Sequence, residues 1–249
     1  MIVQKILLPN KHVCPQKSLY IREISGTTYD INHQKLDFVL HSRCKFDTYF
    51  NAFSLTKWKR FCEFTSYGIH IVAEGNFIIQ IFQTVWKNGV SQKLLFSQYF
   101  ENEVYIRLNP EETFGVISFI LECTSEEGHF ISGDYFIDDE PLRDAKICMA
   151  VCTYRREEYI LGNLKQIQKA ILNNPESPLK DKLDIIVSDN GNTLPLNKFK
   201  KHIKIVYNKN LGGAGGFTRD LVEILDIQDQ KQYTHVLLTD DDKIGRAHV

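Results

Sequence analysis

The run Ile147-Cys148-Met149-Ala150-Val151-Cys152 decides how the second half of this 249-residue chain is interpreted. Six apolar residues in a row, without alternation, are typical of a strand that is buried on both faces of a parallel sheet. The residues that follow agree with this, because Ile160, Leu164 and Ile167 recur at the 3.6-residue period of an amphipathic helix. A buried strand followed by such a helix predicts an open α/β sheet.

The rest of the second half continues the alternation of strand and helix. We expect further strands at 183–187, 203–207 and 236–238, and a helix from Phe217 to about Leu225 after a glycine-rich loop. Together with the first strand they predict one α/β domain over residues 146–249. In such sheets, ligands bind beyond the carboxyl ends of the strands.

The first half has a different pattern. Short runs rich in β-branched and aromatic residues, such as 77–82 and 116–121, are separated by turn signals that include Gly75-Asn76. This pattern predicts an antiparallel β-sandwich over residues 1–140. The acidic, proline-bearing stretch 138–144 is interpreted as the linker between the two domains.

Composition excludes several classes of protein. The chain is 43% hydrophobic and 24% charged, which is typical of a soluble globular protein, and its net charge of −1 argues against a dedicated nucleic-acid binder. No apolar run approaches the roughly 18 to 20 residues that cross a bilayer. The six cysteines form no CxxC pair, which favours a reduced, cytosolic chain.

Every unusual cluster of the second half follows one of the predicted strands. The clusters are Thr153-Tyr154-Arg155-Arg156, Asp189-Asn190-Gly191, the segment 208–216, and Asp240-Asp241-Asp242. The acidic cluster permits two interpretations. It is either a solvated loop or a site where Asp240 and Asp242, two residues apart on an extended segment, share a hard cation such as Mg²⁺ or Mn²⁺.

The other clusters are equally open when each is taken alone. Gly212, Gly213, Gly215 and Gly216 would let the backbone approach an anion closely, or they form a wide turn. Asp189 could accept a hydrogen bond from a uracil or a ribose, or it could cap a local turn. Their common position on one edge of the sheet favours a ligand site.

In order along the chain, these segments resemble family 2 glycosyltransferases of the GT-A fold, and most closely the bacterial polymerising galactofuranosyltransferases. The glycine segment from Asn210 to Phe217 is the most specific part of the resemblance. The family carries a β-sandwich before its transferase domain. The resemblance therefore implies a truncated α/β GT-A (Rossmann-like) nucleotide-sugar domain over 146–249, preceded by the antiparallel β-sandwich over 1–140.

The resemblance also implies an activity, the transfer of galactofuranose from UDP-galactofuranose to a glycan with inversion at the anomeric carbon. Asp240 and Asp242 would bind Mn²⁺ or Mg²⁺. The residues that would hold the donor are Thr153, Arg156, Asp189, Asn190, Asn210, Gly212, Gly213, Asp240 and Asp241. No catalytic residue is assigned, because the family's base lies in a Trp-Asp-Glu segment beyond the acidic cluster.

The resemblance further implies a glycan or lipid-linked glycan acceptor, a role in cell-surface polysaccharide synthesis, and a cytoplasmic location. It leaves open association with the inner face of the cell membrane and a homo-oligomer. The final segment Ile244–Val249 does not continue the family pattern, and we interpret it as the foreign end of a gene fragment. His248 is not assigned as a metal ligand.

Three alternatives remain. The chain could be another family 2 transferase, such as a rhamnosyltransferase, or a non-catalytic carbohydrate-binding module that carries a transferase remnant. A nucleotidyltransferase would also use an acidic pair on an α/β sheet, and it would need Lys209 or Arg219 to grip phosphate.

Overall fold

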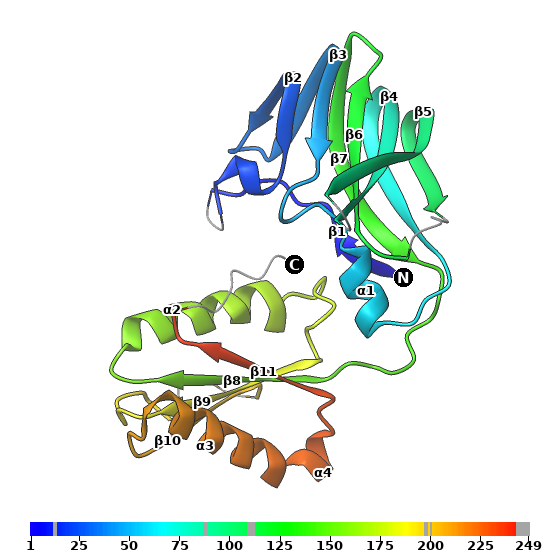
Figure 1. The fold of residues 1–249 in the computed structure, drawn as a ribbon. Helices are drawn as coiled ribbons and strands as arrows, with labels where there is room; N and C mark the ends of the chain where they lie inside the picture. Colours follow the sequence, from blue (N-terminus) through cyan, green and yellow to red (C-terminus); the bar gives the residue numbers. More distant parts are fainter. Residues whose placement is uncertain (12–13, 87–88, 109–112, 197–198, 200, 243–249) are drawn as a thin grey trace. The chain divides into compact units, whose positions relative to one another are not determined.

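The structure is a computed structural model that describes residues 1–242 apart from 12–13, 87–88, 109–112, 197–198 and 200. The segment Ile244–Val249, with His248, lies outside the described residues. The chain divides into two compact units, Met1–Pro141 and Leu142–Val249, which are described separately here (Figure 1).

The first unit is built almost entirely from antiparallel strands. Its sheet runs in the order β1-β7-β3-β6-β4-β5, and β2 pairs with β3. The unit contains β1 (Ile2–Lys5), the 3₁₀ turn η1 (Lys17–Leu19), β2 (Arg22–Asp30), β3 (Lys35–Phe46), α1 (Leu55–Phe61), β4 (Tyr67–Trp86), β5 (Val90–Leu108), β6 (Val116–Cys123) and β7 (Glu127–Ile137).

Long strands connect the two layers of this β-sandwich. The first part of β3 pairs with β7, at Leu36–Val39, whereas its last part pairs with β6, at Arg43–Phe46. β4 divides in the same way, since its first part pairs with β7 and its second part with β6. The enclosed core is aromatic, and Phe46 stacks on Phe119 with ring centroids 4.4 Å apart.

The turn expected at Gly75-Asn76 is wrong, because both residues lie inside the single 20-residue strand β4. The register against β5 shifts between Val72 and Asn76, which marks a β-bulge. Gly75 has a φ of +102°, and a Cβ at this position would lie 2.8 Å from the carbonyl oxygen of Glu127. The glycine therefore bends the strand and does not end it.

The second unit holds a four-stranded parallel sheet in the order β10-β9-β8-β11. Helix α2 and the π-helical turn η2 pack on one face, and α3 packs on the other (Figure 1). Its elements are β8 (Ile147–Thr153), α2 (Glu157–Ile167), η2 (Gln168–Leu172), β9 (Leu183–Asp189), β10 (Ile203–Tyr207), α3 (Gly212–Asp226), α4 (Gln228–Lys231) and β11 (His235–Asp240).

The fold class expected from the sequence, an α/β GT-A fold preceded by a sandwich, is corrected by the structure. Of the described residues, 48% lie in strands, most of them antiparallel, and 19% lie in helices. Its dominant fold is the β-sandwich, and the described part of 142–242 contributes four parallel strands without forming a GT-A domain.

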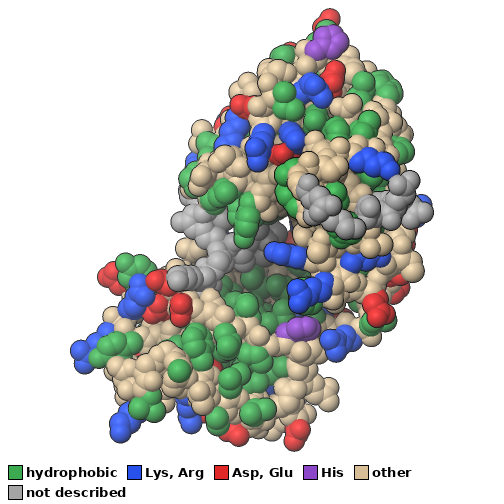
Figure 2. Space-filling view, in the orientation of Figure 1, with side chains coloured by type: hydrophobic (Ala, Val, Ile, Leu, Met, Phe, Trp, Pro, Cys, Tyr) green, Lys and Arg blue, Asp and Glu red, His purple; other side chains and the backbone are tan. Residues whose placement is uncertain are grey.

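Strand β11, which contains the strand expected at 236–238, is exposed. It lies at an edge of the sheet, and Val236, Leu237 and Leu238 are 41%, 48% and 51% exposed. Leu225 on α3 is also exposed. Figure 2 shows hydrophobic side chains at the surface of the unit that contains β8 to β11. Among the described residues, no helix has the length and apolar character needed to cross a membrane.

Candidate functional site

The register of the parallel sheet brings the four polar clusters to one edge. Asp240 at the end of β11 pairs with Cys152 on β8, and Thr153 at the end of β8 pairs with Asp189 on β9. Tyr207 at the end of β10 pairs in turn with Asp189. Since parallel strands share one carboxyl edge, residues up to 88 positions apart in the chain become neighbours.

The acidic cluster is tied directly to the segment after β8. The Thr153 hydroxyl donates to Oδ2 of Asp241 at 2.7 Å, and Arg156 Nη1 donates to Oδ1 of Asp241 at 3.1 Å. Arg156 also donates to Oδ2 of Asp242 through both terminal nitrogens, each at 3.3 Å. Asn163, which sequence reasoning missed, donates to the Asp241 carbonyl at 2.6 Å.

These contacts separate the three aspartates by accessibility. Asp241 is buried, and its two carboxylate oxygens accept from Thr153 and Arg156, so its carboxylate is a fixed part of the local structure. Asp240 and Asp242 are exposed. Both can be reached from solvent, although a ligand of Asp242 would share its carboxylate with Arg156.

A divalent cation at Asp240 and Asp242 is compatible with this donor set. Mg²⁺ is commonly held by one or two carboxylates together with the phosphates of a substrate. Within the described ranges, no group of three His, Cys, Asp or Glu residues is arranged to hold a metal ion. The residues present therefore suit a cation that a diphosphate helps to bind, and they do not form a complete protein site.

The thiol of Cys152 lies among acidic side chains at this edge, and its pKa is raised. Burial, and then the carboxylates of Asp220, Asp241 and Asp240, raise the pKa of Cys152 to about 11. The thiol is therefore neutral near pH 7.

Asp189 is fully buried, and its carboxylate accepts hydrogen bonds from the backbone. Its oxygens accept hydrogen bonds from the backbone N–H groups of Gly191, Thr193 and Leu194 at 2.9, 2.7 and 2.7 Å. This is the turn cap that the sequence left open as an alternative. A hydrogen bond to a nucleotide would have to share these oxygens.

Asn190 links β9 to the glycine segment. Its amide Nδ2 donates to the Gly212 carbonyl at 3.1 Å, and its Oδ1 accepts from Nδ2 of Asn208 at 2.9 Å. Asn210 Oδ1 accepts from the Gly212 N–H at 3.1 Å. Asn208 was not predicted as a site residue, although it is the first residue of the segment 208–216.

The glycine segment is not the loop that the sequence suggested, because Gly212 to Gly216 form the first turns of α3. A Cβ on Gly212 or Gly213 would meet no atom within 4 Å, so open space lies beside both. A Cβ on Gly216 would lie 2.1 Å from Sγ of Cys152. Gly216 thus lets the helix approach β8, whereas Gly212 and Gly213 leave room for a ligand.

Sequence reasoning also missed Asp220, which lies fully buried on α3 beneath this edge. The Ser188 hydroxyl donates to its Oδ1 at 2.6 Å, and its Oδ2 has no partner among the described residues. Burial raises the pKa of Asp220 to about 8. No spacing signal distinguished this aspartate from the solvent-facing acids of an amphipathic helix.

A β-sandwich followed by a parallel α/β unit with a polar carboxyl edge is the class of protein that the fold and the site define. The chain belongs to the family described as galactofuranosyltransferase 2 N-terminal, whose model matches residues 3–136. It is also similar to the galactofuranosyltransferase GlfT2 of Mycobacterium tuberculosis (strain ATCC 25618 / H37Rv), with 23% identity over 267 residues. That match covers 97% of this chain and 39% of the relative, so the chain spans well under half of the relative's length.

Solved structures resemble the chain only distantly. The Gap123 glycosylation-associated protein complex of Streptococcus agalactiae matches with a TM-score of 0.29 and 11% identity, over 87% of this chain and 90% of that one. The carbohydrate-binding module CBM29_1 of Piromyces equi matches with a TM-score of 0.30 and 7% identity, over 49% and 85%. The family match and the sequence similarity to GlfT2 therefore show that the chain is related to galactofuranosyltransferases.

Proposed function

We propose that the chain is part of a metal-dependent family 2 galactofuranosyltransferase and that the carboxyl edge of its parallel sheet holds the donor UDP-galactofuranose. The observation that carries this proposal is the link from Thr153 and Arg156 to Asp241. Two segments that resemble the family's donor-binding motifs are joined through side chains at one edge. The relationship to GlfT2 supports the choice of donor sugar.

Each side chain has a distinct part in holding the donor. The Arg156 side chain is 41% exposed and its guanidinium has five N–H donors, so it can face the diphosphate while it remains paired with Asp241. The open space beside Gly212 and Gly213 lets the nucleotide approach the first turn of α3, where backbone N–H groups favour anions. Asn190 and Asn210 fix the start of that helix.

The reaction that follows is an inverting transfer. A hydroxyl of a glycan or lipid-linked glycan acceptor forms a bond to the anomeric carbon as the bond to the UDP oxygen breaks, and the hydroxyl proton passes to a base. A divalent cation held by Asp240 and Asp242 would act as a Lewis acid on the departing diphosphate. Within 142–242 we assign no general base.

Calorimetry with UDP tests this proposal. The 249-residue chain should bind UDP in the presence of Mn²⁺ and lose at least about tenfold in affinity without it, a change of about 1.4 kcal/mol. Asp240→Ala and Asp242→Ala should each weaken binding by a similar factor. Asp229→Ala, an exposed aspartate on α4, serves as the matched control and should leave binding unchanged.

Two results would contradict the proposal. Binding of UDP that does not depend on Mn²⁺ would remove the metal from the site. Binding that neither aspartate substitution affects would place the nucleotide elsewhere on the chain.

A further inference from the structure

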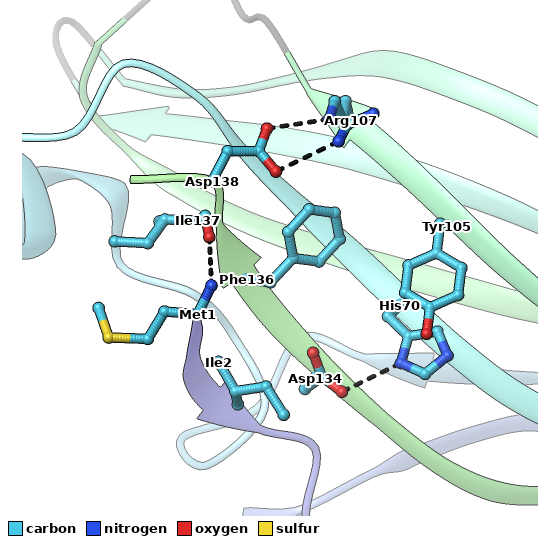
Figure 3. Close-up of a pocket in the computed structure, with 9 residues that line it drawn as sticks. All are labelled: Met1, Ile2, His70, Tyr105, Arg107, Asp134, Phe136, Ile137 and Asp138. Atoms are coloured by element: carbon cyan, nitrogen blue, oxygen red, sulfur yellow. Dashed lines mark hydrogen bonds and ion pairs between the residues drawn. The ribbon is translucent and has the colours of Figure 1, made fainter. Parts of the chain in front are cut away.

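The outer face of the sandwich carries a pocket of about 650 Å³ that the donor site does not use. It lies where β4, β5 and β7 run side by side and β1 joins the edge of β7 (Figure 3). Its lining residues, which are labelled in Figure 3, all belong to the first unit. The outer face of a β-sandwich ordinarily carries polar side chains, so a cluster of aromatic and charged residues around a pocket is unusual there.

Strand register builds the pocket in two rows. In one row, His70 on β4 pairs with Tyr105 on β5 and with Asp134 on β7. In the next row, Gly68 pairs with Arg107 and with Phe136. Residues that share a row on one face lie side by side, so each row presents a set of adjacent side chains.

The missing side chain of Gly68 leaves room for the ring of Phe136. A Cβ at this position would lie 2.4 Å from Cζ of Phe136, so the phenyl ring occupies the space above the glycine. The ring of Tyr105 lies 6.2 Å from that of Phe136, tilted by 62°. The floor of the pocket is therefore apolar and aromatic.

The ring of Tyr105 lies beside this apolar floor. Tyr105 stacks on the imidazole of His70 with ring centroids 3.9 Å apart and planes 8° from parallel. The side chain of Tyr105 is nevertheless 65% exposed. A large aromatic ring that is held rigidly and left exposed is suited to stacking with the apolar face of a ligand.

Planar polar groups surround the rings and are fixed in position. His70 Nδ1 lies 3.2 Å from Asp134, and Nε2 lies 2.9 Å from Glu103. Arg107 donates to Asp138 through Nε at 2.9 Å and Nη2 at 3.3 Å, as Figure 3 shows. Hydrogen bonds from Arg107 and then Ser66 hold the pKa of Asp138 below its usual range, so this carboxylate stays charged.

The carboxylates of the lining are already paired. Asp138 accepts from the guanidinium of Arg107, and Asp134 lies 3.2 Å from Nδ1 of His70. Carboxylate oxygens carry more than one lone pair, so the paired groups can still accept hydrogen bonds from a ligand. The two carboxylates would repel a nucleotide or a phosphate, and their pairing with Arg107 and His70 favours an uncharged ligand over a basic peptide.

We propose that this pocket is a saccharide-binding site that takes a neutral sugar residue, with the sugar's apolar face on Tyr105 and its hydroxyls on Asp134, Arg107 and Asp138. A neutral sugar ring combines one apolar face with a rim of hydroxyls that donate and accept, which matches the aromatic floor and the planar polar groups. The site is separate from the UDP site on the parallel sheet, and it does not depend on the donor proposal.

Saturation-transfer NMR and titration with the 249-residue chain test this site. The probes are methyl β-galactofuranoside, methyl β-galactopyranoside and methyl β-glucopyranoside, because the pocket defines a neutral sugar without choosing its stereochemistry. At least one should bind with a Kd of about 10 mM or tighter, as expected for one small ring in an open site. Excess UDP should leave this binding unchanged, which separates the result from that of the donor site.

Variants of the tyrosines localise the binding. Tyr105→Ala should weaken it by about tenfold or more, whereas Tyr105→Phe, which keeps the ring, should stay within about threefold of the original chain. Tyr99→Ala is the matched control, since Tyr99 is an exposed tyrosine of the same strand that does not line the pocket, and it should change nothing. Thermal melts confirm that each variant is folded.

The proposal is overturned if none of the three sugars binds at about 50 mM, well above the weakest expected Kd. It is also overturned if a folded Tyr105→Ala variant binds as well as the original chain.

Discussion

The hydroxyl of Thr153, at the end of β8, donates a 2.7 Å hydrogen bond to the buried carboxylate of Asp241, the residue that follows β11. The two residues are 88 positions apart in the chain. Through this contact the acidic cluster is anchored by Asp241, and its neighbours Asp240 and Asp242 are left accessible. One aspartate therefore positions the other two.

Removal of this hydroxyl should destabilise the second unit. Thr153→Val preserves the shape of the side chain but leaves the buried carboxylate without one of its donors, so we expect a loss of about 1–3 kcal/mol in the free energy of unfolding. Urea denaturation measures the loss. Thr218→Val, at an exposed position of α3, is the control and should change stability by no more than about 0.5 kcal/mol. Equal losses at both positions would show that the hydrogen bond to Asp241 contributes no more to the free energy of unfolding than the exposed hydroxyl of Thr218 does.

Two glycines of α3 should respond oppositely to alanine. Gly216→Ala places a Cβ against Cys152 and should cost about 1–3 kcal/mol through overpacking. Gly213→Ala meets no atom within 4 Å and should be neutral or stabilising by up to about 1 kcal/mol, because alanine favours a helix. Thermal denaturation of both variants checks this, and a stable Gly216→Ala protein would contradict the close approach of α3 to β8.

Asp220 should make stability fall as the pH rises. Its pKa is raised from 3.8 to about 8 by burial, so the folded state holds its proton more tightly than the unfolded state does. Between these values the unfolded chain binds fewer protons, and the free energy of unfolding therefore decreases with pH. Asp220→Asn should remove this dependence, giving a variant that is more stable than the original chain at pH 8 but not at pH 3.5. A pH series of melts in which both proteins change in parallel would contradict the assignment.

The bulge in β4 should depend on Gly75. Gly75→Ala forces a positive φ on alanine and also brings its Cβ to 2.8 Å from the Glu127 carbonyl oxygen, so we expect a loss of about 2–3 kcal/mol. Gly89→Ala imposes a similar φ but meets no atom within 4 Å, and it should cost about 1 kcal/mol. Comparison of the two by denaturation isolates the steric part, which is absent if the losses are equal.

Elements with strong local patterns were predictable from the sequence. The apolar run 147–152 became β8, because an uninterrupted apolar segment specifies a buried strand on its own. The strand expected at 203–207 is β10, whose isoleucines and valine are buried while Lys204 and Tyr207 are exposed. The bulge at Gly75 was not predictable, since a turn and a bulge both use a glycine with positive φ. The exposure of β11 depends on its place at the sheet edge, which no local pattern encodes.

The sequence indicated which residues would lie at the candidate site, but not which of them are buried and which are exposed. The order of the strands implied that Thr153, Arg156 and the aspartates would meet, and their hydrogen bonds confirm that they do. The sequence could not show that Asp241 is buried. Nor could it show that Asp189 is held by three backbone N–H groups, because both depend on how the chain turns after each strand.

The central claim is that the carboxyl edge of the parallel sheet binds a nucleotide sugar, and chemical-shift mapping by NMR tests it most directly. On addition of UDP-galactofuranose with Mg²⁺, the account predicts that the backbone amide shifts change chiefly near Arg156, Asn190, Gly212, Gly213 and Asp240. At donor concentrations well below the Kd of about 10 mM expected for a single sugar in the sandwich pocket, the amides of the first unit should not move. No change at this edge, or changes confined to the sandwich, would contradict the claim.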